Sequence, residues 1–349
     1  MIRFNPLTIE MFKRFRRIRR GYYSCLLMLA LIILSLCSEL LVNSRALLVK
    51  YDGKYYLPTY GSIIPGIKFG LNYEYETNYR ELKGKIKNYS ADNFVILPPI
   101  PFNPFETELK DGEYPPLAPS LSGMHYLGTD KTGRDVAARL IYGFRIAIFF
   151  SLILLFFNYI IGVTVGCMMG YIGGKFDLFF QRIVEIWNNI PYLYAIIIIS
   201  SILIPNFFSL IGIMIFFGWI GITWYMRTAT YKEREREYVL AARALGAGTT
   251  RIIVKHILPN TISVIVTFIP FSVAEGITSL TALDYLGFGM PAPTPSWGQL
   301  LSEASEYNIT APWIGISVIS SLIFILIMVT FIGEAVRESF DPKHFSTYE

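Results

Sequence analysis

Few residues of this sequence have the types and spacing that enzymatic chemistry requires. The three histidines, His125, His256 and His344, lie in separate segments without a cysteine partner, and the chain contains no His-Glu-x-x-His pattern. A catalytic site needs a nucleophile, a base or metal ligands that can converge on one point. We therefore expect no catalytic residue, no metal site and no enzymatic activity, with each histidine serving in a loop or at an interface.

The sequence also lacks the loop that would allow the chain to hydrolyse a nucleotide. A phosphate-binding loop has the form Gly-x4-Gly-Lys-Ser/Thr, in which backbone amides surround the phosphates. Gly173-Gly-Lys175 is followed by Phe176 and has no earlier glycine at the required spacing. We expect no directly bound cofactor, so that any use of ATP and magnesium would fall to a separate protein.

The most specific stretch of the chain begins at Glu237, breaks at Gly246 and ends at Pro259. Its spacing predicts a short helix, a glycine with the positive φ of a helix end, and a second helix. Two interpretations stay open: a helix lying on the bilayer surface, or a helix that docks in a groove of a soluble partner. The alternating charges from Lys232 to Glu237 favour the second, because an anionic lipid surface would select basic residues alone.

The composition indicates which elements must position this stretch. Of the 349 residues, 53% are hydrophobic and 16% are charged, which is typical of a membrane protein and not of a soluble domain. A bilayer requires roughly 20 apolar residues for each spanning helix. The sequence predicts six spans, at residues 23–43, 145–170, 178–204, 207–226, 262–283 and 312–334.

The positions of Lys and Arg predict the side of the membrane on which each segment lies, because cytoplasmic loops are enriched in them. The loop 227–260 holds seven basic residues, whereas residues 284–311 hold none. We therefore expect this loop and both termini in the cytoplasm. The net charge of +5 is then explained by basic residues on the cytoplasmic side of the membrane, and no nucleic-acid partner is expected.

The predicted organisation follows from these spans. It comprises a basic cytoplasmic N-terminus (1–22), the first span (23–43), an insert on the other side of the membrane (44–144), a core of five spans (145–342) that contains the loop 227–260, and a cytoplasmic C-terminus (335–349). Prolines clustered at 98–104 and 115–119 disfavour helix and predict a long, mostly irregular insert. Its last part, Gly128-Thr-Asp-Lys-Thr-Gly-Arg-Asp135, is compact enough for its carboxylates to brace a turn, which we favour over contact with substrate.

Several residues in or near the spans suggest further roles. Glu275 has no nearby cation in the sequence, so it could line a polar path through the membrane and favour a positively charged group there, or bond another helix. Glu185 is expected to pair with Arg182 on its own helix. Pro293 and Trp297 lie in an extended exterior loop that could form an external gate, with Trp297 at the membrane surface.

Glycines at near-helical spacing, Gly162, Gly166 and Gly170, lie in the second span. Small residues let helix backbones approach closely in a membrane. We favour packing within this subunit over a special contact between subunits.

The stretch from Glu237 to Pro259 resembles the EAA loop of the binding-protein-dependent ABC importer permeases. Tyr-Val-Leu stands between the glutamate and the alanine pair, as in the peptide branch of that family. The resemblance implies a coupling helix seated in a cleft of the ATPase. The residues that carry this implied role are Glu237, Ala241, Ala242, Arg243, Leu245, Gly246, Leu258 and Pro259.

Three other segments, residues 127–145, 286–298 and 333–342, are similar to the C-type permease subunits of dipeptide and oligopeptide importers. Residues 38–58, ahead of the long proline-rich stretch, are similar to the YejE-type permeases of peptide and microcin C importers. The resemblance then covers nearly the whole chain. It implies an all-α polytopic membrane protein with six transmembrane helices of the type I ABC importer fold, located in the bacterial inner membrane.

The same resemblance implies the partners and the mechanism. A second permease subunit would complete a heterodimer in the lipid bilayer, with ATP-binding cassette ATPase subunits and a periplasmic substrate-binding protein. The cargo would be a peptide or peptide-like compound, moved by alternating access as the ATPases close on ATP. A membrane channel, a scaffold and a transporter that is not coupled to ATP are the alternatives, and each predicts no dependence on an ATPase.

Overall fold

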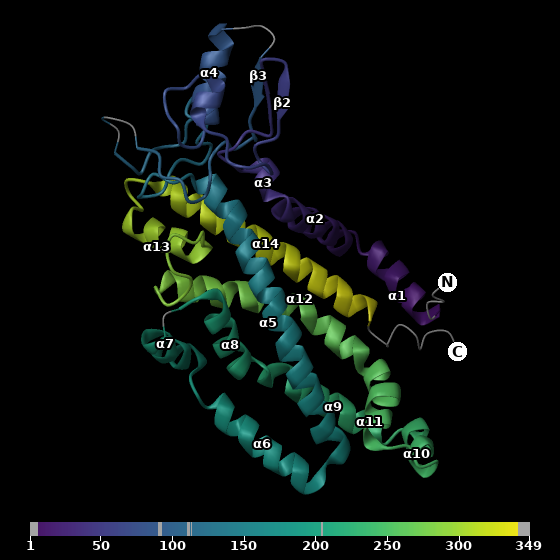
Figure 1. Ribbon diagram of the computed structural model, residues 1–349. Helices are drawn as coiled ribbons and strands as arrows, with labels where there is room; N and C mark the ends of the chain where they lie inside the picture. Colours follow the sequence, from purple (N-terminus) through teal and green to yellow (C-terminus); the bar gives the residue numbers. More distant parts are fainter. Residues whose placement is uncertain (1–5, 90–92, 110–111, 113, 204, 341–349) are drawn as a thin grey trace.

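The computed structural model describes residues 6–89, 93–109, 112, 114–203 and 205–340, and it consists mainly of long, packed helices (Figure 1). Within these residues, five helices are long and apolar enough to cross a membrane, or six if one bent pair forms a single span. The prediction of an all-α polytopic membrane protein is confirmed. The predicted terminal segments 1–22 and 335–349 lie partly outside the described residues.

The helices have the following bounds: α1 Pro6–Arg17, α2 Arg19–Leu36, α3 Ser38–Leu41, α4 Tyr79–Tyr89, α5 Val136–Ile172, α6 Gly174–Asn188, α7 Tyr192–Ile202, α8 Phe207–Gly218, α9 Ile220–Arg234, α10 Glu237–Ala244, α11 Thr249–Ile252, α12 Leu258–Tyr285, α13 Trp297–Glu306 and α14 Pro312–Ser339. A 3-10 turn, η1, spans Gly66–Phe69, and a π-helical turn, η2, spans Ile253–Ile257. The core joins α5, α12, α13 and α14, and α2 packs along α14.

The predicted span at 178–204 is not one straight helix. It consists of α6 and α7, which meet at an angle of 71°. Pro191 stands directly before α7, where its ring disfavours helical backbone in the preceding residue and it has no N–H to continue a helix. The bend therefore follows from Pro191, which a prediction based on the apolar pattern alone does not take into account.

The insert differs from the irregular segment that its prolines predict. Strands β1 (Leu48–Tyr51), β2 (Lys54–Tyr56) and β3 (Phe94–Ile96) form an antiparallel sheet in the order β2-β1-β3. Asp52 and Gly53 both have positive φ between β1 and β2, as a tight two-residue hairpin requires. The sheet and α4 enclose a small separate core that contains Val49, Phe69 and Leu82. Among the described residues, the segment between β2 and α4, apart from η1, and the proline-rich stretch between β3 and α5 are irregular as predicted.

The three glycines of the second span bring α5 against α9. A Cβ added at Gly162, Gly166 or Gly170 would lie 2.5 to 2.6 Å from a backbone carbonyl oxygen of α9 or of its N-cap residue, Trp219. Such distances leave no room for any side chain, so the two backbones are in direct contact. Packing within this subunit, the favoured interpretation of the glycine spacing, is confirmed.

The two ends of the bundle carry different features. In Figure 1 the insert lies at one end, beside α13 and the start of α5, and α10 and α11 lie at the other. The α9 helix leads directly into α10, so the α5–α9 contact connects the two ends.

Replacing Gly166 with alanine tests this contact. The new Cβ would lie 2.6 Å from the Thr223 carbonyl oxygen, which is backbone and cannot move aside. We expect the free energy of unfolding to fall by about 1 to 3 kcal/mol, the usual cost of overpacking. Thermal melting of the purified chain in detergent measures this loss. Gly212→Ala on α8 is the matched control, because nothing lies within 4 Å of its added Cβ; equal melting of both variants would contradict the contact.

Candidate functional site

The segment with the expected coupling residues folds as a helix, a glycine stop and a second helix. After α10, Gly246 has φ +80°, and its N–H donates to the Arg243 carbonyl at 3.0 Å. The Ala247 N–H donates to the Ala242 carbonyl at 3.1 Å. This pair of bonds is the Schellman motif, which satisfies the last carbonyls of a helix and needs a residue with positive φ. The helix break predicted at Gly246 is confirmed.

One buried side chain fixes α10 to the bundle. Val239 is almost completely buried and packs with Ile252 at the end of α11 and Ile257 at the end of η2. Ala242 and Ala247, the two residues joined by the Schellman bond, pack against the same cluster. Small side chains at these positions let α10 lie close to the turn that follows it.

The opposite face of α10 is open. Leu245 is 88% exposed, Leu240 is 47% exposed, and Ala241 is exposed beside them. Glu237 and Arg243 are also exposed, so the apolar face has a charge of each sign at its border. Leu258 and Pro259 are the first two residues of α12, so they connect this segment to one of the long helices of the core.

A tyrosine between Glu237 and the alanine pair ties α10 back to α9. The Tyr238 hydroxyl donates to the Glu233 carboxylate. Partial burial, together with this carboxylate, raises the pKa of Tyr238 to about 12. The phenol therefore stays protonated and donates at physiological pH.

A cavity of about 520 Å³ lies within the bundle, between α5, α6, α7, α9 and α12. Glu275 of α12 lines it, together with aromatic side chains from each of the other helices. Glu275 is exposed, and it forms no hydrogen bond or ion pair with another residue in the described part of the chain. The structure thus places this glutamate where a translocation path would require it, and its role in transport stays a prediction.

Buried charges form a polar cluster where the insert meets the bundle. Asp130 is fully buried and accepts from the Arg134 Nε at 2.7 Å and from the backbone N–H groups of Thr132 and Arg134. Arg139, also fully buried, lies 3.4 Å from Asp130 and donates to the Gln299 side chain at 3.0 Å. Bracing of this turn, the favoured interpretation of its aspartates, is confirmed.

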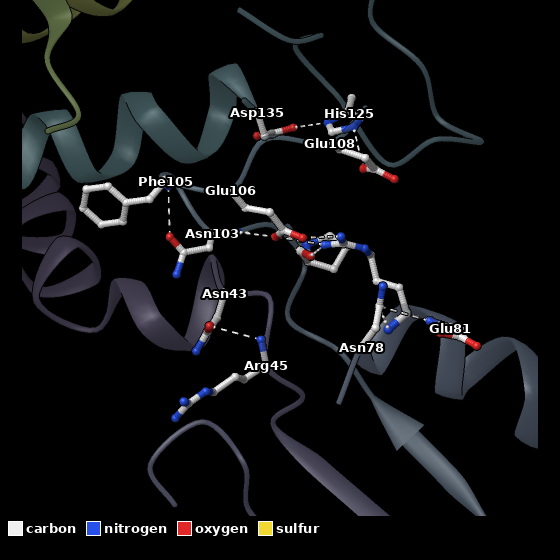
Figure 2. Close-up of polar contacts among 12 residues, drawn as sticks. Asn43, Arg45, Asn78, Glu81, Asn103, Phe105, Glu106, Glu108, His125 and Asp135 are labelled. Atoms are coloured by element: carbon white, nitrogen blue, oxygen red, sulfur yellow. Dashed lines mark hydrogen bonds and ion pairs between the residues drawn. The ribbon is translucent and has the colours of Figure 1, made fainter. Parts of the chain in front are cut away.

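His125 joins the insert to the first turn of α5 (Figure 2). Its Nδ1 lies 2.8 Å from Asp135 and its Nε2 lies 3.2 Å from Glu108, while Asp135 also accepts from the Ala138 N–H as the N-cap of α5. Burial lowers the pKa of His125, but the two carboxylates outweigh it and raise the pKa to about 9. A lone histidine in the sequence gave no sign of these partners.

Trp297, the first residue of α13, is fixed by packing against α5. It is 4% exposed, and its Nε1 donates to the Leu140 carbonyl of α5 at 2.8 Å. Helix packing therefore buries nearly the whole indole, and its position at the membrane interface stays a prediction. Pro293 is exposed, and its carbonyl accepts from Arg139 at 3.4 Å. An external gate formed by these two residues stays a prediction.

Two ion pairs lie near α6. Arg182 contacts Glu185 at 2.6 Å one turn along the helix, as predicted. Asp177 accepts two bonds from Arg227 of α9, at 2.6 and 2.7 Å. The sequence did not indicate this second pair, because its members are fifty residues apart.

Comparison with known families identifies the class of this protein. Residues 162–344, more than half of the chain, match the family described as binding-protein-dependent transport system inner membrane component. The chain belongs to this family and is a permease subunit of a binding-protein-dependent ABC transporter. Such subunits are multi-pass proteins of the inner membrane without a catalytic role, and their system implies ATPase and binding-protein partners.

Individual relatives are similar along nearly the full length. The Inner membrane ABC transporter permease protein YejE of Escherichia coli (strain K12) is 40% identical over 98% of this chain and 99% of its own length. The Peptidoglycan transport system permease protein YejE of Agrobacterium fabrum is 38% identical over 97% and 94%. The Oligopeptide transport system permease protein OppC of Haemophilus influenzae is 32% identical over 72% and 80%. The resemblance to YejE-type and C-type permeases is confirmed.

Among solved structures, the inward-facing MetNI methionine ABC transporter aligns with 58% of this chain and 96% of its own chain. The identity is 16% and the TM-score is 0.46.

The buried histidine generates a prediction about pH. Because its pKa is about 9 in the folded chain and about 6.5 in an unfolded one, His125 contributes stability that is complete below pH 6.5 and is lost as pH rises through 9. We expect the melting temperature in detergent to fall between pH 7.5 and 10, and to fall less in His125→Gln. If both proteins lose the same number of degrees over this interval, His125 is not the cation that its contacts indicate.

Proposed function

We propose that this chain imports peptides or peptide-like compounds across the inner membrane as one half of a translocation pathway. Separate ATPase subunits supply the energy, and the bundle alternates between inward and outward openings as they bind and hydrolyse ATP. The names of its relatives, which include oligopeptide and peptidoglycan transport permeases, support this class of cargo. The exposed apolar face of α10 is the observation that carries the proposed coupling.

The α10 face has the properties of a docking surface for another protein. Exposed leucine and alanine side chains are costly in water and favourable in an interface, at about 25 cal/mol for each Å² of apolar surface that is buried. Val239, on the opposite side of α10, anchors the helix to the bundle. The exposed leucines of the apolar face are therefore not needed to hold the helix in place. A short helix laid in a groove is a common form of protein recognition, and the ATPase cleft is the proposed groove.

The connections of α10 supply a route for movement. It follows α9 after two residues, and α11 and η2 lead from it into α12. Both α9 and α12 line the cavity that holds Glu275. A displacement of α10 by the ATPase would therefore reach two walls of the cavity, which is how ATP binding would change access to it.

The orientation follows from charge. The basic loop around α10 would lie in the cytoplasm with both termini, and the insert would lie in the periplasm. A periplasmic binding protein would then deliver cargo at the insert end, near the proposed gate at Pro293 and Trp297. A second permease subunit would supply the other half of the pathway as a heterodimer, since one bundle of six spans lines only one side.

Leu245→Glu tests the coupling surface. Leu245 is 88% exposed, so the variant should fold with an unchanged melting temperature. A charge in the proposed interface removes about 1.5 to 3 kcal/mol of apolar burial and adds a desolvation cost. We expect at least a tenfold loss of ATPase subunits that co-purify with the tagged chain, together with loss of transport.

The matched control is Leu121→Glu, which adds the same charge at a leucine that is 83% exposed in the insert. It should leave ATPase association unchanged. Normal co-purification of the ATPase with Leu245→Glu would remove α10 as the coupling helix.

A further inference from the structure

The cavity of about 520 Å³ has one acidic group and no basic one. Among the described residues that line it, Glu275 is the only carboxylate, and none is lysine, arginine or histidine. Its volume lies within the roughly 300 to 1,000 Å³ that is usual for sites that enclose small organic molecules. Glu275 is therefore the one side chain of the described wall that can carry a full charge.

The contacts of Glu275 give it no structural task. A charged side chain within a spanning helix is expensive unless it is paired or faces a water-filled space. Glu275 has no hydrogen-bonding or ionic partner in the described part of the chain, and its side chain is exposed on the cavity side of α12. The glutamate on α6 differs, since Glu185 is neutralised by Arg182 at 2.6 Å.

Hydroxyl groups lie in the same wall. The Tyr159 hydroxyl and the Ser272 Oγ lie 2.9 Å apart, and both residues line the cavity. Asn158 of α5 lines the cavity too, but its Oδ1 is buried and has no hydrogen-bond partner within the described chain. The wall thus offers hydroxyl oxygens in addition to one carboxylate.

Much of the rest of the wall is aromatic, beside aliphatic side chains. Trp187, Tyr192, Trp224, Tyr225 and Phe268 contribute rings from four helices. Aromatic faces attract cations, most strongly where water is excluded, and also pack against apolar groups. A carboxylate and oxygen acceptors among aromatic rings favour an organic ammonium ion with an apolar body.

We infer that this cavity binds the ammonium group of the cargo, with Glu275 as its counter-ion. An ammonium group has three donors and no acceptor, so its donors suit a carboxylate and hydroxyl oxygens. The inference rests on the proposed transport function and deepens it, because it makes a free amino group a requirement within the membrane. In peptides this group is the N-terminal ammonium.

Cysteine labelling measures the charge of the cavity without any need for transport. In a variant whose native cysteines are alanine, Ser279→Cys places a thiol on the cavity wall one turn from Glu275. The assembled importer in nanodiscs is treated with a cationic methanethiosulfonate (ethyltrimethylammonium) and an anionic one (ethylsulfonate). Coulomb attraction at this separation should make the ratio of their rates fall at least about fivefold in Glu275→Gln. Glu185→Gln is the control and should leave the ratio unchanged.

Protection of the same thiol tests the cargo group. We expect the dipeptide Ala-Phe at millimolar concentration to slow labelling at least threefold, whereas N-acetyl-Ala-Phe should not, and neither should protect in Glu275→Gln. An unreactive thiol, an unchanged rate ratio, equal protection by both peptides or protection by neither would each overturn the inference. None of these results depends on α10, so a failure of coupling, seen as retained ATPase on Leu245→Glu, is distinguishable from a failure of this site.

Discussion

The direct backbone contact between α5 and α9 is the constraint on which the other features depend. Glycines at 162, 166 and 170 remove the α5 side chains where the two backbones approach most closely, so neither helix can slide or separate without losing the fit. The α9 helix leads into α10, and α5 begins at the polar cluster beside the insert. Both helices also form walls of the cavity. One tight contact therefore joins the proposed ATPase surface, the proposed cargo site and the insert.

The two ends of the bundle are held by different physical means. At the insert end, Asp130, Arg139 and His125 are buried, and each charge has close opposite charges and hydrogen-bond partners, which is the condition under which buried ions are tolerated. At the other end, Val239 and two isoleucines hold α10 through aliphatic contact, and the Tyr238 hydroxyl donates to Glu233 of α9. Aliphatic contact is not directional, so α10 is the end suited to being moved by a partner.

The sequence predicted features that depend on local pattern, and it missed those that depend on contacts between distant segments. Apolar runs, the glycine break at Gly246 and the EAA-like spacing predicted the spanning helices and the helix stop. The bend before α7 was missed because an apolar run outweighed Pro191, and the folded part of the insert because its prolines outweighed the Asp52-Gly53 turn. Contacts between segments far apart in the sequence produce the partners of His125, the burial of Trp297 and the cavity around Glu275. The spacing of residues along the chain does not indicate such contacts.

The most direct test of the central claim is uptake of a peptide mixture into proteoliposomes that contain this chain, its second permease and the ATPases, with the binding protein outside. Imported peptides are identified by mass spectrometry, with and without ATP on the ATPase side. We expect accumulation that requires ATP, the binding protein and this chain together. Uptake that continues without ATP or without the ATPases would show a channel or an uncoupled transporter, and would contradict the coupling of α10 to the cavity.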